Sequence, residues 1–300
     1  YVFDYAWAQA YSDHGLDYYP RLVTCVPFSP VIGARVWLAD GVDLVEVLPY
    51  LLRGVRQLAQ QLNASSWHGL FWDESSLAAL NDDNIAVRTG CQFLWSNEDY
   101  ADFDGFLTML TTKRRKMIRA ERRKVAAFGV TCAWIEGESI TAVDWTFFYQ
   151  CYVHTYHVRG QKPSLSQAFF EQIGRTMSGS IVLEVASADG HRIAAALFFK
   201  DDNTLYGRYW GALHDVDCLH FEVCYYQGID YAIAQGLRFF DPGTQGEHKL
   251  VRGFAPIETH SVHWLSDARF MAAVQDFVAR ERDGVMEYMA QARESLPYKF

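Results

Sequence analysis

The stretch Ser180–Gly211, SIVLEVASADGHRIAAALFFKDDNTLYGRYWG, decides the fold class. It holds three segments rich in β-branched, aromatic and other apolar residues, which are typical of strands: Ser180–Ser187, Arg192–Lys200 and Thr204–Gly211. The short polar sequences Ala188-Asp189-Gly190 and Asp201-Asp202-Asn203 separate them as turns. Three strands joined by two tight turns predict an antiparallel meander.

Helices and further strands flank this meander. Upstream, the sequence predicts one long amphipathic helix, a strand and two helices, over Phe106–Phe128, Val130–Ile135, Asp144–Val158 and Gln167–Met177. Downstream, it predicts a helix, two short strands and a last helix, over His220–Gln235, Arg238–Asp241, His260–Leu265 and Phe270–Ala292. This order predicts an α+β fold with a mixed, mostly antiparallel sheet.

The first hundred residues resemble an incomplete α/β unit. Asp43–Leu62 has helical periodicity. The sequence predicts strands at Tyr1–Ala8, Trp67–Trp72 and Gln92–Trp95. Arg21–Pro27 and Ala34–Leu38 are short apolar runs with turn signals between them. Because the first residue is Tyr1 and strand-like sequence begins at once, we expect the chain to start inside a longer protein.

The composition of the 300 residues is that of a globular protein, with 50% hydrophobic and 15% aromatic residues. No apolar run reaches the roughly 18 residues that a membrane span needs, and no signal peptide is present. Six cysteines lie mostly among apolar neighbours and form no zinc motif. Reduced, buried cysteines of this kind predict a cytoplasmic protein.

Charge is spread unevenly. The net charge is −9, yet Lys113–Lys124 holds eight basic residues and one acidic one, so this segment carries +7 and the remainder −16. Arg115, Arg119 and Arg123 stack at helical spacing with Arg122 beside them, which destabilises an isolated helix. RNA phosphates would relieve this repulsion and make these four arginines candidates for RNA binding. Pairing with acidic residues of the same protein, or simple solvation, explains the pattern equally well.

Two segments resemble known families. Lys113–Val130, KRRKMIRAERRKVAAFGV, resembles the basic helix that leads into the second GNAT unit of Fem aminoacyl transferases. Asp241–Phe254, DPGTQGEHKLVRGF, is similar to the signature of bacterial FemAB-like N-acyltransferases, and QFLW at Gln92–Trp95 and Tyr18-Tyr19-Pro20 also suit that family. The resemblance spans nearly the whole chain and implies tandem GNAT-like units. Residues 1–102 would form a first unit that lacks its opening strands, and 103–300 a complete second unit that begins with the basic helix.

The signature segment supplies the main candidate site. Acylation of an amine needs a base for the amine proton and donors for the developing oxyanion. Glu247 or His248 could be the base, and Lys249 and Arg252 could hold a phosphate or carboxylate. Gln245 and Gly246 belong to the same predicted donor-binding segment, where glycine permits tight turns and close approach of a ligand. A solvated polar loop is the alternative interpretation.

A second group of candidates comes from the meander and the following helix. The last meander strand would direct Arg208 and Trp210 to one face, where they could contact the donor, and Tyr209 to the other. The helix would bring Glu222, as a further catalytic candidate, and either Tyr225 or Tyr226 to a shared face. An aromatic core with polar tips would give the same pattern.

The expected donor follows from one difference between this sequence and the GNAT enzymes that it resembles. The resemblance implies that His220–Gln235 is the helix whose N-terminus points at the acyl donor in GNAT enzymes, and it is called the donor helix below. GNAT enzymes that use acetyl-CoA carry a glycine-rich pyrophosphate loop before that helix, whereas Ala212–Leu219 has no glycine and two aspartates. The resemblance therefore implies either an unusual acyl-CoA or an aminoacyl-tRNA as donor, a small-molecule or peptide amine as acceptor, and no tightly bound cofactor. His154–His157 and His214–Glu222 have no recognisable metal-ligand spacing, so no metal is expected.

Two functions remain open from the sequence. The first is an N-acyltransferase in which the amine attacks the donor directly. The second is a non-catalytic GNAT-like module that binds RNA or a peptide. No oligomeric state is assigned.

Overall fold

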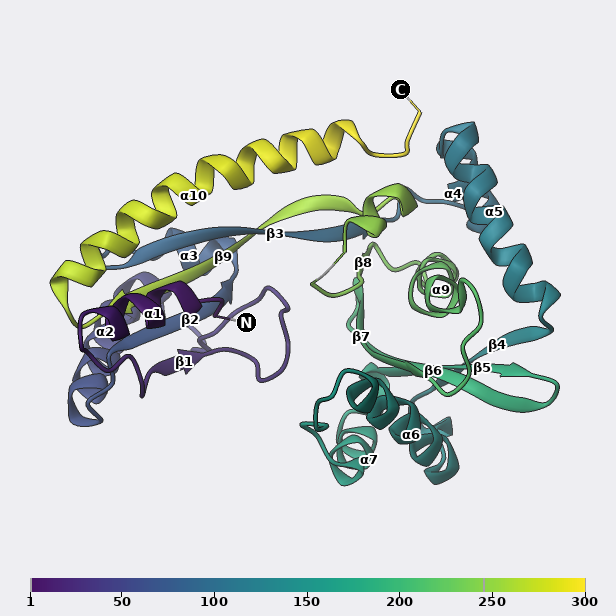
Figure 1. The fold of residues 1–300 in the computed structure, drawn as a ribbon, viewed down its shortest axis with the longest axis horizontal. Helices are drawn as coiled ribbons and strands as arrows, with labels where there is room; N and C mark the ends of the chain where they lie inside the picture. Colours follow the sequence, from purple (N-terminus) through teal and green to yellow (C-terminus); the bar gives the residue numbers. More distant parts are fainter. Residues whose placement is uncertain (1, 245, 300) are drawn as a thin grey trace. The chain divides into compact units, whose positions relative to one another are not determined.

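The computed structural model describes residues 2–244 and 246–299, which divide into two compact units (Figure 1). The first unit comprises Tyr1–Gln92 and Pro256–Glu294, and the second Phe93–Ala255 and Ser295–Phe300. This division differs from the predicted boundary after residue 102, because the chain returns to the first unit after Ala255. There its strand β9 (Ala255–Leu265) pairs antiparallel with β2 (Ser66–Trp72).

The first unit carries its strands in the order β1-β2-β9-β3. Its elements are α1 (Tyr5–Asp13), β1 (Leu22–Thr24), α2 (Leu44–Gln61), β2, α3 (Glu74–Ala78), β3 (Ala86–Ser96), β9 and α10 (Ala268–Glu294). Helix α2 begins where the Asp43 carboxylate accepts a hydrogen bond from the backbone N–H of Val45. Leu48 and Leu52 on its buried face pack in one cluster with Trp67 and Trp72 of β2.

The second unit carries the predicted meander. Its strands lie in the order β3-β8-β7-β6-β5-β4, and β4 to β7 are antiparallel. The elements are α4 (Phe103–Met109), α5 (Thr112–Ala127), β4 (Val130–Glu136), α6 (Ala142–Val158), α7 (Gln167–Thr176), β5 (Ile181–Ala188), β6 (His191–Lys200), β7 (Thr204–Ala212), α8 (Leu219–Phe221), a π-helical turn (Glu222–Tyr226), α9 (Gln227–Ala234), β8 (Phe239–Asp241) and a 3-10 turn (Glu247–Arg252). The mixed α+β fold class is confirmed.

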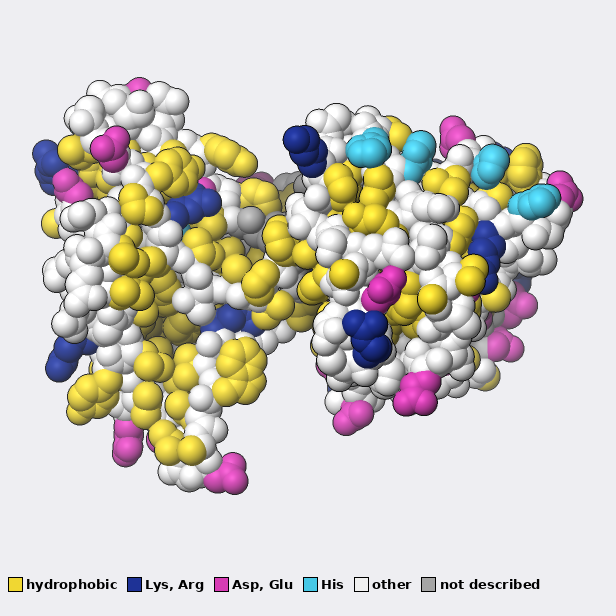
Figure 2. All heavy atoms as spheres, turned by 90° about the horizontal axis from the view of Figure 1, so that it is seen from below, with side chains coloured by type: hydrophobic (Ala, Val, Ile, Leu, Met, Phe, Trp, Pro, Cys, Tyr) yellow, Lys and Arg dark blue, Asp and Glu magenta, His cyan; other side chains and the backbone are white. Residues whose placement is uncertain are grey.

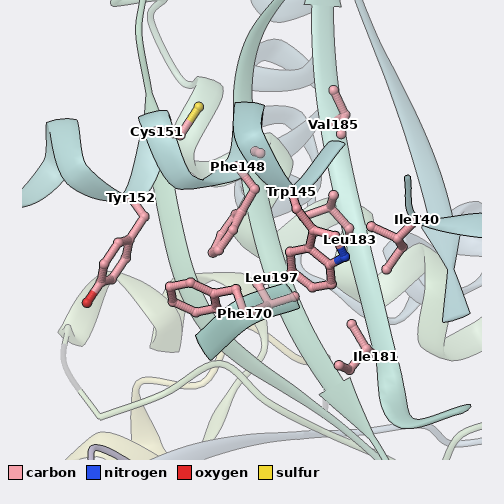
Figure 3. Packing of buried hydrophobic residues seen from close by; sticks show 11 residues of the cluster. Ile140, Trp145, Phe148, Cys151, Tyr152, Phe170, Ile181, Leu183, Val185 and Leu197 are labelled. Atoms are coloured by element: carbon pink, nitrogen blue, oxygen red, sulfur yellow. The ribbon is translucent and has the colours of Figure 1, made fainter. Parts of the chain in front are cut away.

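Helices α6 and α7 cover one face of the meander. Trp145, Phe148 and Phe170 of these helices pack against Leu183 and Leu197 of the strands (Figure 3). The helix approaches the sheet very closely, since a Cβ atom at Gly211 would lie 2.0 Å from the carbonyl oxygen of Cys151. This packing fixes β7, from which the candidate site is built.

Two predicted elements are wrong, and one of the short apolar runs forms no element. The single helix over Phe106–Phe128 is broken between α4 and α5, because Leu110 is extended and the Thr111 N–H donates to the Pro297 carbonyl. The predicted strand Tyr1–Ala8 is not a strand over its described residues, because Tyr5–Ala8 belong to helix α1, whose Trp7 and Tyr11 are buried. Ala34–Leu38 forms no regular element.

Large hydrophobic side chains remain exposed on the first unit. Trp37 is 79% exposed, and Tyr5, Tyr50 and Phe28 are exposed as well. Figure 2 shows hydrophobic side chains gathered in several places at its left, whereas Lys and Arg side chains on that face stand singly. The concentrated positive charge of this protein is therefore a property of α5 and not of that face.

A buried histidine pair lies in the core of the first unit. His68 Nδ1 and His263 Nδ1 are 2.8 Å apart, and both side chains are fully buried. His68 Nε2 also contacts the Tyr18 hydroxyl and Ser66 Oγ, at 3.0 and 2.9 Å. Burial lowers the pKa of His68 from 6.5 to about 4, and burial followed by the neighbouring His68 lowers the pKa of His263 well below its usual value.

This pair predicts acid sensitivity of the first unit. Both pKa values are lower in the folded state than in the unfolded state. The stability that the first unit gains from keeping these histidines neutral is therefore fully present above pH 6.5 and is lost as the pH falls toward 4. Unfolding in this range takes up on the order of one proton per histidine. Hydrogen exchange of β2 peptides, corrected for intrinsic rates, should show protection that falls between pH 7 and 5. The His68→Gln/His263→Gln protein should lose most of this slope, whereas His14→Gln, at an exposed histidine, should retain it. Equal slopes in all three proteins would contradict the prediction.

Candidate functional site

Strand β7 is irregular where it reaches the candidate site. Leu197 pairs with Tyr209 while the next residue, Phe198, pairs with Gly207, so Arg208 lies in a β-bulge. Tyr209 packs against the α6–α7 layer, whereas the Trp210 ring lies 5.1 Å from that of His220 at the start of the donor helix. The predicted opposite orientation of these two neighbours agrees with these contacts.

Strands β7 and β8 pair over a short length only. Thr204 to Tyr206 pair in parallel with Phe239 to Asp241, and β7 then continues to Ala212. Beyond Tyr206 the two strands are therefore no longer paired among the described residues. The segment from Pro242 to Phe254 begins at this point.

The donor helix begins with a turn of unusual geometry. Residues Glu222–Tyr226 form a π-helical turn between α8 and α9, a feature that is frequent at functional sites. The turn places the Tyr225 hydroxyl 2.8 Å from His248 Nε2. The His220 ring meets the Tyr225 ring edge-on at 5.3 Å and the His248 ring at 6.2 Å. The donor helix and the signature segment thus meet in one histidine–tyrosine cluster.

Electrostatics keep this cluster uncharged. Burial lowers the pKa of His220 to about 4, with smaller contributions from His248 and Arg252. Burial, Arg252 and Lys249 also lower the pKa of His248. Burial raises the pKa of Tyr225. At neutral pH the two imidazoles are therefore free bases and the phenol keeps its proton, so the cluster can both accept and donate protons.

Glycines shape the signature segment. Gly246 and Gly253 flank the 3-10 turn with φ values of +111° and +95°. A Cβ atom at Gly246 would lie 2.1 Å from the His248 ring, so a side chain there would displace the imidazole. The spacing of the signature therefore sets the position of His248.

Lys249 is buried beneath this segment. It is 1% exposed, and its ammonium group donates to the Gly243 carbonyl. Burial lowers its pKa to about 8, against the opposing effect of Asp241. Burial raises the pKa of Asp241, whose carboxylate accepts a hydrogen bond from the Gly243 N–H. Lys249 thus anchors the glycine turn from the inside.

Arg252 joins three segments. It is 3% exposed and donates to both carboxylate oxygens of Glu121 on α5, at 2.9 and 2.8 Å. It also donates to the Tyr226 hydroxyl and the His248 carbonyl, each at 2.8 Å, and lies 3.6 Å from the centre of the Phe221 ring. Tyr226 in turn donates to Glu121. Through these contacts, Arg252 holds the donor helix and the 3-10 turn in position.

Much of the basic helix is paired within the protein. Arg119 binds Asp104 at 2.8 Å, and Lys124 binds Asp217 at 2.8 Å. Arg122 bridges Glu222 and Asp230 at 3.0 and 3.2 Å and lies over the Phe103 ring. Arg123 is exposed, and among the described residues it forms no hydrogen bond or ion pair. The repulsion seen in the sequence is thus relieved in part by acidic residues of the same chain.

The predicted site residues separate into two groups. His248, Lys249 and Arg252 share the 3-10 turn with the exposed Glu247, and Trp210 joins the cluster through His220. Glu222 faces α5 instead, through its ion pair with Arg122. Gln245 lies outside the described residues. The sequence interpretation did not select His220 or Glu121. Glu121 could have been noticed as the one acidic residue in the basic segment.

Comparison with known proteins identifies the family. The FemAB-like family, described as peptidoglycan biosynthesis/recognition, matches residues 1–300. The chain belongs to the FemAB-like family. No curated protein matches its sequence significantly.

Solved structures of Fem-related and other proteins share the fold. FemX is 14% identical, with 84% of this chain and 85% of FemX covered and a TM-score of 0.53. L-PGS from Bacillus licheniformis is 10% identical, with 78% and 79% covered and a TM-score of 0.55. The C-terminal domain of a lysylphosphatidylglycerol synthetase candidate from Agrobacterium fabrum is 13% identical, with 77% of each chain covered and a TM-score of 0.53. At these identities the FemAB-like chain shares their fold alone.

Residues 2–244 and 246–299 contain no group of three or more His, Cys, Asp or Glu side chains arranged to hold a metal ion. No helix among them has the length and apolar character that crossing a membrane requires.

The buried ion pair predicts a large effect of one substitution. Glu121→Ala leaves Arg252 buried without its partner, so we expect a loss of about 3–5 kcal/mol in the free energy of unfolding. Asp217→Ala, which breaks the fully exposed pair with Lys124, should change the free energy of unfolding far less, because water screens that pair. Urea unfolding followed by circular dichroism, with hydrogen exchange of α5 peptides, measures both. Similar losses in the two variants would show that Glu121 does not hold Arg252 in place.

Proposed function

We propose that this FemAB-like protein transfers an acyl or aminoacyl group from an activated donor to an amine by direct attack. The observation that carries this proposal is the 2.8 Å contact between Tyr225 and His248 at the π-helical turn. It supplies a neutral base and a protonated acid where the donor helix meets the signature segment, which follows directly on β8. Family membership supports a transferase, and the likeness to FemX supports the fold.

In the proposed reaction, His248 acts as the base. The amine nitrogen attacks the donor carbonyl carbon, the C–N bond forms, and the C–S or C–O bond to the donor breaks. The proton lost by the nitrogen passes to the His248 imidazole, which is neutral at pH 7 because its pKa is lowered by burial and by Arg252 and Lys249. Glu247 was the other candidate base. It is exposed, and we propose that it attracts the cationic acceptor.

Tyr225 is the proposed acid. Burial raises the pKa of its phenol, so it holds a proton to give to the leaving thiolate or alkoxide. Arg208, in the bulge, and Trp210, beside His220, are proposed to contact the donor. Gly246 permits the position of His248, while Lys249, Arg252 and Tyr226 hold the turn and the helix together and are positioning residues.

For the donor, we favour an aminoacyl-tRNA over acyl-CoA. The turn before the donor helix exposes Asp215 and Asp217, which disfavours a pyrophosphate. Arg115 and Arg123 are proposed to contact RNA phosphates, whereas Arg119 and Arg122 would have to exchange their present ion pairs to do so. The acceptor we propose is a peptide amine, in keeping with the family's description.

Single substitutions test the proposed pair. With aminoacyl-tRNA as donor and a peptidoglycan stem peptide bearing a free amine as acceptor, His248→Gln and Tyr225→Phe should each lower kcat by about 10²–10⁴. His157→Gln, at an exposed histidine of α6, should leave kcat unchanged. Below the pKa of His248 the wild-type rate should fall, because the imidazole is then protonated. Turnover that survives both site substitutions would disprove these roles.

The non-catalytic alternative makes a different prediction in the same assay. If neither charged tRNA nor any of several acyl-CoAs is consumed while RNA binding persists, the protein is a binding module.

A further inference from the structure

The segment that follows α10 lies against the signature segment. Helix α10 ends in the first unit at Glu294, whereas the C-terminal tail, Ser295–Lys299, belongs to the second. In this tail, Tyr298 forms an antiparallel bridge with Leu110, which lies between α4 and α5. The Tyr298 hydroxyl donates to the Gly253 carbonyl at 2.7 Å. The tail therefore contacts both the α4–α5 junction and the end of the 3-10 turn.

Main-chain hydrogen bonds hold the tail at the α4–α5 junction. The Thr111 N–H donates to the Pro297 carbonyl at 2.7 Å, and the Lys299 N–H donates to the Met109 carbonyl at 2.9 Å. The Lys299 ammonium group also donates to the Thr108 carbonyl. Thr108 and Met109 are the last residues of α4, whose carbonyls have no partner within the helix. The tail satisfies these groups, so the place where α5 begins depends on the tail.

The contact between the tail and Gly253 is close. Gly253 directly follows the 3-10 turn, with a φ of +95°, and its N–H donates to the Leu250 carbonyl at 3.0 Å. A Cβ atom at Gly253 would lie 2.9 Å from the Tyr298 hydroxyl oxygen and 3.2 Å from the ring of the fully buried Phe106. Burial raises the pKa of Tyr298, so its hydroxyl keeps the proton that it donates. The 3-10 turn is thus held at its end by the tail.

Helix α5 reaches the same turn by a second route. Its residue Glu121 accepts hydrogen bonds from Arg252 at 2.9 and 2.8 Å. Arg252 precedes Gly253 and also donates to the His248 carbonyl at 2.8 Å. The tail, α5 and the 3-10 turn therefore form a closed circuit of contacts. A closed circuit restricts the turn more than either contact alone, because a shift at one contact requires a shift at the other.

We propose that Tyr298 is a positioning residue, which holds the 3-10 turn so that the His248 imidazole meets the Tyr225 hydroxyl. This inference rests on the proposed function, in which these two groups transfer protons. Tyr298 acts through Gly253 and Arg252 and not by contact with the substrate. Without its hydrogen bond, the turn would move away from the donor helix and His248 would become more exposed.

The pKa of His248 reports the position of the turn without any turnover. Burial is the largest cause of its lowered value. The titratable and charged groups around it come from the donor helix and the 3-10 turn: Tyr225, His220, Arg252 and Lys249. Tyr298→Phe keeps the ring but loses the hydrogen bond, so the His248 pKa should rise toward that of a free imidazole. NMR titration of the whole protein measures it, with the His248 signal assigned by its absence in His248→Gln.

Hydrogen exchange gives a second readout. Tyr298→Phe should lower the protection of peptides from Glu247–Phe254 about tenfold, the effect of one lost hydrogen bond. Peptides of β5 and β6 should keep their protection. Tyr152→Phe is the matched control, because it removes a tyrosine hydroxyl that accepts a hydrogen bond from the Leu165 N–H in the α6–α7 layer. It should leave both readouts unchanged.

The outcomes separate this proposal from the proposed reaction. An unchanged His248 pKa in Tyr298→Phe, or a loss of protection that is equal in the β5 and β6 peptides, would overturn the role of Tyr298 even if the protein is a transferase. In the transfer assay, the acid limb of the rate–pH profile should move upward with the His248 pKa. If both readouts change but no donor is ever consumed, the tail holds the turn as proposed and the proposed reaction fails.

Discussion

The buried Arg252 guanidinium is the interaction on which the candidate site depends. It ties α5, through Glu121, to the π-helical turn, through Tyr226, and to the 3-10 turn, through the His248 carbonyl. A charge that is 3% exposed is tolerated only when its donors are satisfied, and here a carboxylate, a phenol, a carbonyl and an aromatic ring surround it. Loss of the contact between Arg252 and any one of these three segments would therefore loosen the other two.

This arrangement gives the two sides of the donor helix different chemistry. Tyr225 meets His248 on the side of the signature segment, where the groups are neutral and can exchange protons. Glu222 meets Arg122 on the α5 side, where the groups are charged and paired. The π-helical turn changes the helical spacing over the five residues that hold these side chains.

The sequence predicted those features that follow from local pattern. The meander was readable from two turns between apolar strands, and α2 from its helical periodicity. The break at Leu110 was not, because it depends on a hydrogen bond to Pro297, nearly two hundred residues away in the chain. Burial of Lys249 and Arg252 was equally hidden, since charged residues in a glycine-containing segment are usually solvated and their partners come from distant elements. Family resemblance located the segment, and packing determined what its charges do.

Formation of an amide product tests the transferase assignment most directly. The whole protein is incubated with charged tRNA or with acyl-CoAs, together with an amine-bearing stem peptide, and the peptide is analysed by mass spectrometry. A FemAB-like transferase that works through His248 and Tyr225 should add the mass of one donor acyl group to the peptide amine, and His248→Gln should abolish most of that product. Donor that stays intact with every acceptor, or product that forms equally well without the His248 imidazole, would contradict the assignment.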